Sequence, residues 1–118
     1  FVKSLPRPVP AREHPPEIMR KGLEAFVKAR CDSCHSFPHF TNLAQVSSSF
    51  LFNTEDSFHW LDTPSLLSVS TSPPYLFDGR AQNLDEVIGR YNSNNRHGDT
   101  AMLSDAEKVA LVQLLEAL

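Results

Sequence analysis

Apolar residues recur at close to helical spacing in the first third of the chain. Between Pro16 and about Arg30, four apolar side chains fall near one helical face: Ile18, Leu23, Phe26 and Val27. The pair Pro15–Pro16 suits a helix start, because the first N–H groups of a helix have no internal partner to lose. The pattern predicts an amphipathic helix over 16–30.

Two further helices are predicted in the second half of the chain. Ser104 and Glu107 form a capping-box pattern. The leucines that follow occupy positions i, i+3, i+4 and i+7 of one helical face: Leu111, Leu114, Leu115 and Leu118. A shorter helix is predicted over Leu84 to Tyr91, with Asn83 as N-cap and Glu86 three residues later.

The middle of the chain carries no such period. From His39 to Ser72 the sequence is irregular, with no alternating strand pattern of useful length and one helical turn expected at Thr63–Ser68 behind Pro64. The predicted class is all-α, with three main helices and long loops. Because long loops in a small domain usually wrap something, we expect the loops to enclose a bound group.

The N-terminal residues are predicted to be a connector. They hold five of the nine prolines: Pro6, Pro8, Pro10, Pro15 and Pro16. Phe1–Leu5 has apolar spacing similar to that of Leu114–Leu118, by chance or because it is the tail of a preceding, similar domain. We therefore divide the chain into a linker or tail over 1–14 and one domain over 15–118.

Composition narrows the function classes. With 118 residues, 41% hydrophobic and 21% charged, the chain is expected to fold as a single domain. A net charge of −3 without a Lys/Arg cluster argues against a nucleic-acid partner. No apolar run approaches the roughly 18 residues of a membrane span. The chain opens on Phe1 and shows no signal peptide, so we expect upstream residues to have been removed.

The chemistry concentrates at Cys31, Cys34 and His35, within the stretch "CDSCH". A structural zinc site would need about four protein ligands, and here the other histidines are scattered singly. A thioredoxin-like disulfide favours βαβ surroundings, which the pattern does not predict. A covalent haem uses every residue of the motif, with one thiol for each vinyl group and the imidazole for iron. Zinc and disulfide stay open as alternatives.

The position of the motif resembles the cytochrome c fold. In that family the first helix carries a Gly-x-x-x-aromatic pattern where it crosses the last helix, and this chain has "GLEAF" from Gly22 to Phe26. The family's aromatic residue on the closing helix is absent, and Leu114 looks like its replacement. The resemblance implies close approach of the two helix backbones at Gly22.

A narrower resemblance covers Asp62–Ile88, "DTPSLLSVSTSPPYLFDGRAQNLDEVI". This stretch resembles the electron-transfer haem domain of di-haem cytochrome c peroxidases, with its Asp-x-Pro-Ser/Thr-Leu start, Pro-Tyr-x-His-Asp-Gly turn and Thr-Leu-Glu-Glu-Val helix. Three positions depart from the pattern: Leu67 for Arg, Phe77 for His and Asn83 for Thr. The chain also has one Cys-x-x-Cys-His where those enzymes have two. One haem resembles only the electron-delivering half, so we expect an electron carrier rather than a complete enzyme. The alternative is a peroxidase or ligand-sensing domain with an open or labile sixth iron position.

Four residues are candidates for the sixth iron ligand. Met102 precedes the closing helix, near where cytochromes c place an axial methionine, and it is preferred to Met19, which we expect in the core. Tyr91 falls where the peroxidase-like domains keep their distal ligand. His97 and His59 are the remaining candidates. We predict His35 and Met102 as the iron ligands.

Other residues are expected around the haem. Arg80 could donate to a propionate, as could the indole N–H of Trp60, although a solvated Arg80 is the alternative. The expected pocket residues are Leu66, Tyr75, Leu76 and Phe77, and those expected in the wrapping loop are Phe50, Phe52 and Phe58. Because covalent haem c is assembled outside the cytoplasm, the motif implies a bacterial periplasmic or exported location. The expected partners are redox proteins or a fused catalytic domain.

Overall fold

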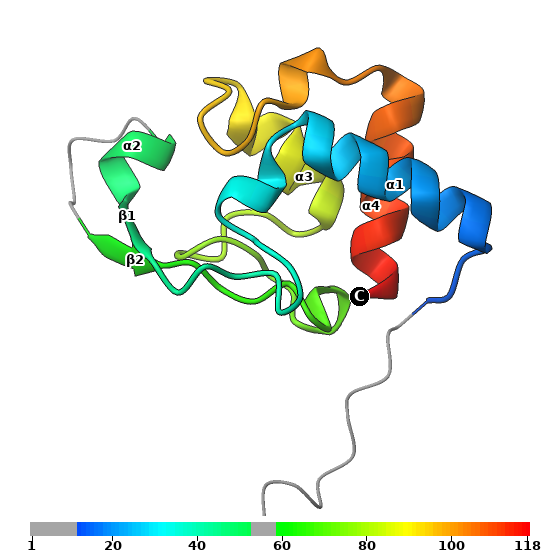
Figure 1. Ribbon diagram of the computed structural model, residues 1–118. Coiled ribbons are helices and arrows are strands. Elements are labelled where there is room, and N and C mark those ends of the chain that lie inside the picture. Colours follow the sequence, from blue (N-terminus) through cyan, green and yellow to red (C-terminus); the bar gives the residue numbers. More distant parts are fainter. Residues whose placement is uncertain (1–11, 53–58) are drawn as a thin grey trace, which may run out of the picture.

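The computed structural model describes residues 12–52 and 59–118, and in this part the chain is mostly helical with one small sheet (Figure 1). Two predictions fall outside the described residues, namely the tail segment Phe1–Leu5 and the wrapping-loop residue Phe58. The elements, with η for 3₁₀ helices, are α1 (Pro16–Lys28), η2 (Cys31–Ser33), β1 (Gln45–Ser47), α2 (Ser48–Phe52), β2 (Trp60–Asp62), η3 (Val69–Thr71), α3 (Leu84–Ile88), η4 (Arg90–Asn92), η5 (Thr100–Met102) and α4 (Asp105–Ala117).

The most extensive contact between two elements is the crossing of α1 and α4 (Figure 1). α1 begins at Pro16 as predicted and ends at Lys28, two residues before the expected end, because Arg30 adopts a left-handed conformation with φ of 62°. At the crossing, a Cβ placed on Gly22 would lie 2.5 Å from the Ala110 carbonyl oxygen and 2.7 Å from Leu114 Cβ. The expected close approach at Gly22, with Leu114 opposite, is therefore confirmed.

The hydrophobic core lies between these two helices and the loops beneath them. Phe26 and Leu111 are fully buried at its centre. The Phe26 ring also contacts two loop rings, with centroid distances of 5.9 Å to Phe37 and 5.7 Å to Phe40. Phe26 therefore connects α1 both to α4 and to the loop that follows the cysteines.

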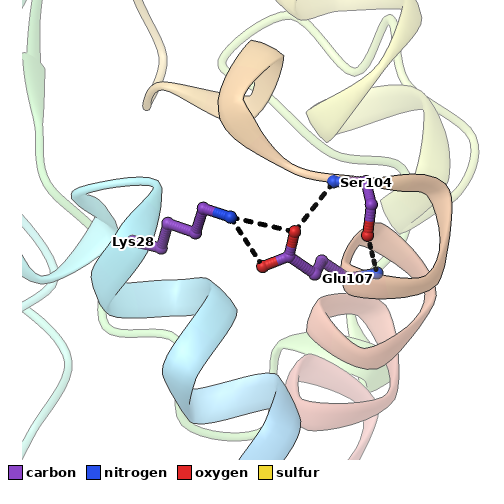
Figure 2. Close-up of polar contacts among 3 residues, drawn as sticks. All are labelled: Lys28, Ser104 and Glu107. Atoms are coloured by element: carbon purple, nitrogen blue, oxygen red, sulfur yellow. Dashed lines mark hydrogen bonds and ion pairs between the residues drawn. The ribbon is translucent and has the colours of Figure 1, made fainter.

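The predicted capping box starts α4. The Glu107 N–H donates to Ser104 Oγ at 3.1 Å, and the Ser104 N–H donates to Glu107 Oε1 at 3.0 Å. Lys28 Nζ donates to both carboxylate oxygens of Glu107 at 3.1 Å (Figure 2). Glu107 therefore joins the end of α1 to the start of α4.

The predicted helix at Leu84 is also present but shorter than expected. The Asn83 side chain accepts from the Glu86 N–H at 2.9 Å, which confirms the N-cap. α3 ends at Ile88, and the chain continues as η4 rather than as one helix to Tyr91.

The prediction of a strictly all-α fold is wrong in one region. β1 and β2 form an antiparallel pair in which Gln45 faces Asp62 and Ser47 faces Trp60. Each strand has three residues, which is too short for an alternating pattern to stand out in sequence. The helical turn expected at Thr63–Ser68 forms later, as η3.

Within the described ranges, no helix is both long enough and apolar enough to cross a bilayer.

Candidate haem site

The two cysteines lie on the turn that follows α1. Cys31 begins η2, and its carbonyl oxygen accepts from the N–H groups of Cys34 and His35 at 3.3 and 2.8 Å. This turn places both thiols and the imidazole within a few residues of the helix end. Cys31 is half-buried, Cys34 is exposed, and both thiols are free.

The Cys31 thiol is held in its protonated form. Burial, followed by the effect of the neighbouring Asp32 carboxylate, raises the pKa of Cys31 to about 12. Reactive disulfide thiols and zinc ligands act as thiolates, and their sites usually lower the thiol pKa. The surroundings of Cys31 alone therefore do not activate its thiol.

The His35 ring is oriented by two backbone carbonyls. Its Nδ1 lies 3.1 Å from the Phe40 oxygen and 3.0 Å from the Pro64 oxygen. Because carbonyl oxygens only accept, this geometry assigns the ring proton to Nδ1 and leaves the Nε2 lone pair for a metal. Burial lowers the pKa of His35, against the effect of these two hydrogen bonds, and so favours the neutral ring.

Hydrogen bonds between two loops hold those carbonyls in place. The Thr41 hydroxyl donates to the Thr63 oxygen at 2.6 Å, and the Ser65 hydroxyl donates to the His39 oxygen at 2.6 Å. The sequence motif over 62–66 is recognised by its side chains, but the atom that contacts His35 is the main-chain oxygen of Pro64. Side-chain patterns carry little signal for such a contact.

A second imidazole lies near His35. The ring centroids of His35 and His97 are 6.5 Å apart, with an angle of 42° between the ring planes. His97 Nδ1 is buried and has no hydrogen-bond partner among the described residues. Burial, followed by the effect of the nearby His35, lowers the pKa of His97 to about 4.

Aromatic rings extend this region away from the two histidines. The Phe52 ring lies 6.4 Å from the His97 ring and 5.3 Å from the Phe77 ring, between centroids. The guanidinium of Arg80 lies 5.0 Å from the Phe52 centroid and 5.9 Å from that of Tyr91. These side chains come from α2, the turn before α3, and η4, which the fold brings together.

Arg80 makes an ion pair in this structure. Its Nε lies 2.9 Å from both Asp78 carboxylate oxygens, and its Nη2 lies 2.6 Å from Oδ2. The Arg80 side chain lowers the pKa of Asp78 through these hydrogen bonds. The propionate contact predicted for Arg80 stays a prediction, since the structure shows its guanidinium bonded to Asp78.

Other predicted residues lie elsewhere. Tyr75 packs against the core, and its main chain pairs with Ala81 at 2.7 and 3.3 Å, while burial raises the pKa of its phenol. Met102 ends η5 and is 55% exposed. Met19 packs against the core, as predicted. Trp60, on β2, is 62% exposed.

The residues present fit a covalently held haem. Two free thiols one turn apart precede an imidazole with a free Nε2, and a buried nitrogen without a partner lies on a facing ring. Residues 12–52 and 59–118 contain no group of three or more His, Cys, Asp or Glu arranged to hold a metal ion. A zinc site built from these described residues alone is therefore not supported.

Comparison with known proteins gives one relative by sequence and one by structure. No protein-family model matches the chain. The chain is 27% identical over 107 residues to the cytochrome-c peroxidase IdrP2 of Denitromonas iodatirespirans, a match that covers 87% of this chain and 29% of that protein. Its fold matches a chain of Kuenenia stuttgartiensis hydrazine synthase pressurised with xenon, with a TM-score of 0.74 and 21% identity over 99% of this chain and 52% of that one.

These similarities support a cytochrome-like domain. The structural match bears on the fold alone, and the sequence match is to a cytochrome-c peroxidase of which this chain spans 29%. The mostly helical architecture is compatible with a cytochrome c-like fold, with the two-stranded sheet as an addition. The chain thus spans about three-tenths of the length of the one protein and about half of the other.

Proposed function

We propose that this chain is a single-haem electron-transfer domain, acting as a module of a larger exported redox protein or pathway. The observation that carries the proposal is the position of His35, which follows two free thiols and has its Nδ1 fixed by two carbonyl oxygens. This arrangement aims Nε2 as a metal ligand before any metal arrives. Redox proteins or a fused catalytic domain would be its partners.

The chain's own residues would attach, orient and shield the cofactor. Cys31 and Cys34 would each add their S–H across one vinyl group, forming an S–C bond while the hydrogen goes to the neighbouring carbon, with no net oxidation. When bound, haem iron supplies the one-electron chemistry. The rings of Phe52 and Phe77 would keep water from the site, and a dry environment favours the less charged oxidation state.

Attachment can be tested with Cys34→Ala. The chain is produced with haem-maturation machinery, and covalent haem is measured by acid–acetone extraction and intact mass. We expect the parent to retain one haem per chain and Cys34→Ala to lose one of the two linkages. Ser36→Ala, which removes a nearby hydroxyl bonded to the Thr41 oxygen, is the matched control and should retain both. Because a free vinyl group shifts the reduced pyridine haemochrome band, a band in Cys34→Ala at the position of the parent's band would contradict attachment through both thiols.

A second candidate is a peroxidase or ligand-sensing domain with an open or labile iron position. The similarity to a cytochrome-c peroxidase favours it. Peroxide chemistry needs an accessible iron position and a nearby acid–base group. Rapid binding of carbon monoxide to the ferrous protein would support this candidate, whereas slow or absent binding supports the carrier.

A further inference from the structure

We propose that His97 would bind the haem iron together with His35. This inference rests on the proposed function and goes beyond it by naming the residue that closes the iron site. It replaces Met102, the sequence expectation, with a histidine held in the loop before η5.

The spacing of the two rings suits one metal ion between them. With metal–nitrogen bonds of about 2.0–2.1 Å and about 1.15 Å from nitrogen to ring centre, two imidazoles on opposite sides of one ion have centroids about 6.3–6.5 Å apart. The His35 and His97 centroids are 6.5 Å apart. His35 offers Nε2, because its Nδ1 is already bonded to carbonyl oxygens.

The His97 ring also has a nitrogen that the protein leaves unsatisfied. Its Nδ1 is buried and bonds to none of the described residues. Buried polar atoms are nearly always hydrogen-bonded, so an exception needs an explanation, and a bound ion is one such explanation. A ligand bond to iron would use the lone pair of such a nitrogen.

Hydrogen bonds hold the loop that carries His97 in place. The His97 N–H donates to Asn92 Oδ1 at 2.8 Å, and buried Asn92 donates to the Gly98 oxygen at 3.0 Å and to Thr100 Oγ1 at 2.7 Å. The Asp99 N–H donates to the Ala29 oxygen at 2.7 Å. The loop is therefore fixed against the end of the helix that leads into the cysteines.

Gly98 allows this loop to approach the attachment site. Its φ of +84° favours glycine, and a Cβ there would lie 3.3 Å from the Ala29 oxygen and 3.7 Å from Cys31 Sγ. The residue next to His97 thus lies beside a thiol of the haem motif. Met102, by contrast, is 55% exposed, and the Tyr91 ring faces the guanidinium groups of Arg80 and Arg90.

The test compares three matured proteins by ferric optical spectrum and near-infrared magnetic circular dichroism: the parent, His97→Ala and Met102→Ala. We expect a bis-imidazole band in the parent, unchanged in Met102→Ala. We expect His97→Ala to lose the low-spin spectrum and to recover it when imidazole is added.

Two results would overturn the assignment. One is a methionine–iron band in the parent, and the other is a His97→Ala spectrum identical to that of the parent. If His97→Ala does not mature, the band of the parent together with Met102→Ala still decides between the two ligands. Failure of the proposed function looks different, because the parent would then carry no covalent haem at all.

Discussion

The α1–α4 crossing and the loop side of the molecule are held together by different kinds of contact. The crossing consists of apolar side chains around fully buried Phe26 and Leu111, with Gly22 at its closest point. The loop side depends on hydrogen bonds to main-chain oxygens and on Asn92, and it carries the His97 nitrogen that has no described partner. The difference indicates that the helix pair supplies stability, while the loops position the groups that would meet the cofactor.

The largest effect is expected for Phe26→Ala, which removes the ring shared by both regions. Losing a fully buried aromatic side chain costs about 3–5 kcal/mol of unfolding free energy. The measurement is denaturant unfolding followed by far-UV circular dichroism. Val27→Ala, at an exposed neighbouring position, is the control and should change stability by less than about 1 kcal/mol. Equal effects of the two variants would contradict the assignment of Phe26 to the core.

Gly22→Val should destabilise only the α1–α4 crossing. The new Cβ would collide with the Ala110 oxygen and with Leu114, and overpacking of this kind costs about 1–3 kcal/mol. Thermal unfolding measures the loss, with Leu23→Val on the outer face of α1 as the matched control. A melting temperature equal to that of the parent would show that the helices do not meet at Gly22.

Asn92→Ala should disrupt only the hydrogen bonds of the loop side. It leaves the Gly98 oxygen, Thr100 Oγ1 and the His97 N–H without their partner, at a cost of about 1–3 kcal/mol. We expect hydrogen exchange to accelerate around 97–100 and to stay unchanged in α1. Asn94→Ala is the control, since the Asn94 side chain donates to the Leu51 oxygen and accepts from the Arg96 N–H but bonds none of residues 97–100. Equal acceleration in α1 would mean that the two regions are not separable.

The smallest effect is expected for Glu107→Gln, and it depends on pH. Bonding to the Ser104 N–H, and then to Lys28, lowers the pKa of Glu107 in the folded state. Its stabilising contribution is therefore present above the unfolded pKa and is lost as pH falls through the folded one. The difference in unfolding midpoint between parent and variant should be largest near neutral pH and should shrink in acid. Lys28→Met removes only one of the two partners and should give a smaller difference; a difference that does not vary with pH would contradict the account.

The helix pair could be predicted from sequence because its signals are local. The prolines before α1, the Ser104–Glu107 box and the Gly22–Leu114 approach are all read from side chains a few residues apart or from a known pattern. The sheet was missed because its strands are short and pair across an intervening segment.

The candidate site was only partly predictable for a related reason. Cys31, Cys34 and His35 are adjacent and have a recognisable spacing. The Pro64 oxygen that orients His35 is main chain, and the opposition of His97 to His35 depends on how the Asn92 network folds the loop. Neither the Pro64–His35 hydrogen bond nor the proximity of His97 to His35 can be predicted from a periodic pattern in the sequence.

The most direct test of the central claim is a spectroelectrochemical titration of the matured chain. The account predicts one covalent haem per chain, reduced and reoxidised reversibly in a single one-electron step. A colourless protein, or one whose haem does not take up and return one electron reversibly, would contradict the assignment of this chain as an electron-transfer domain.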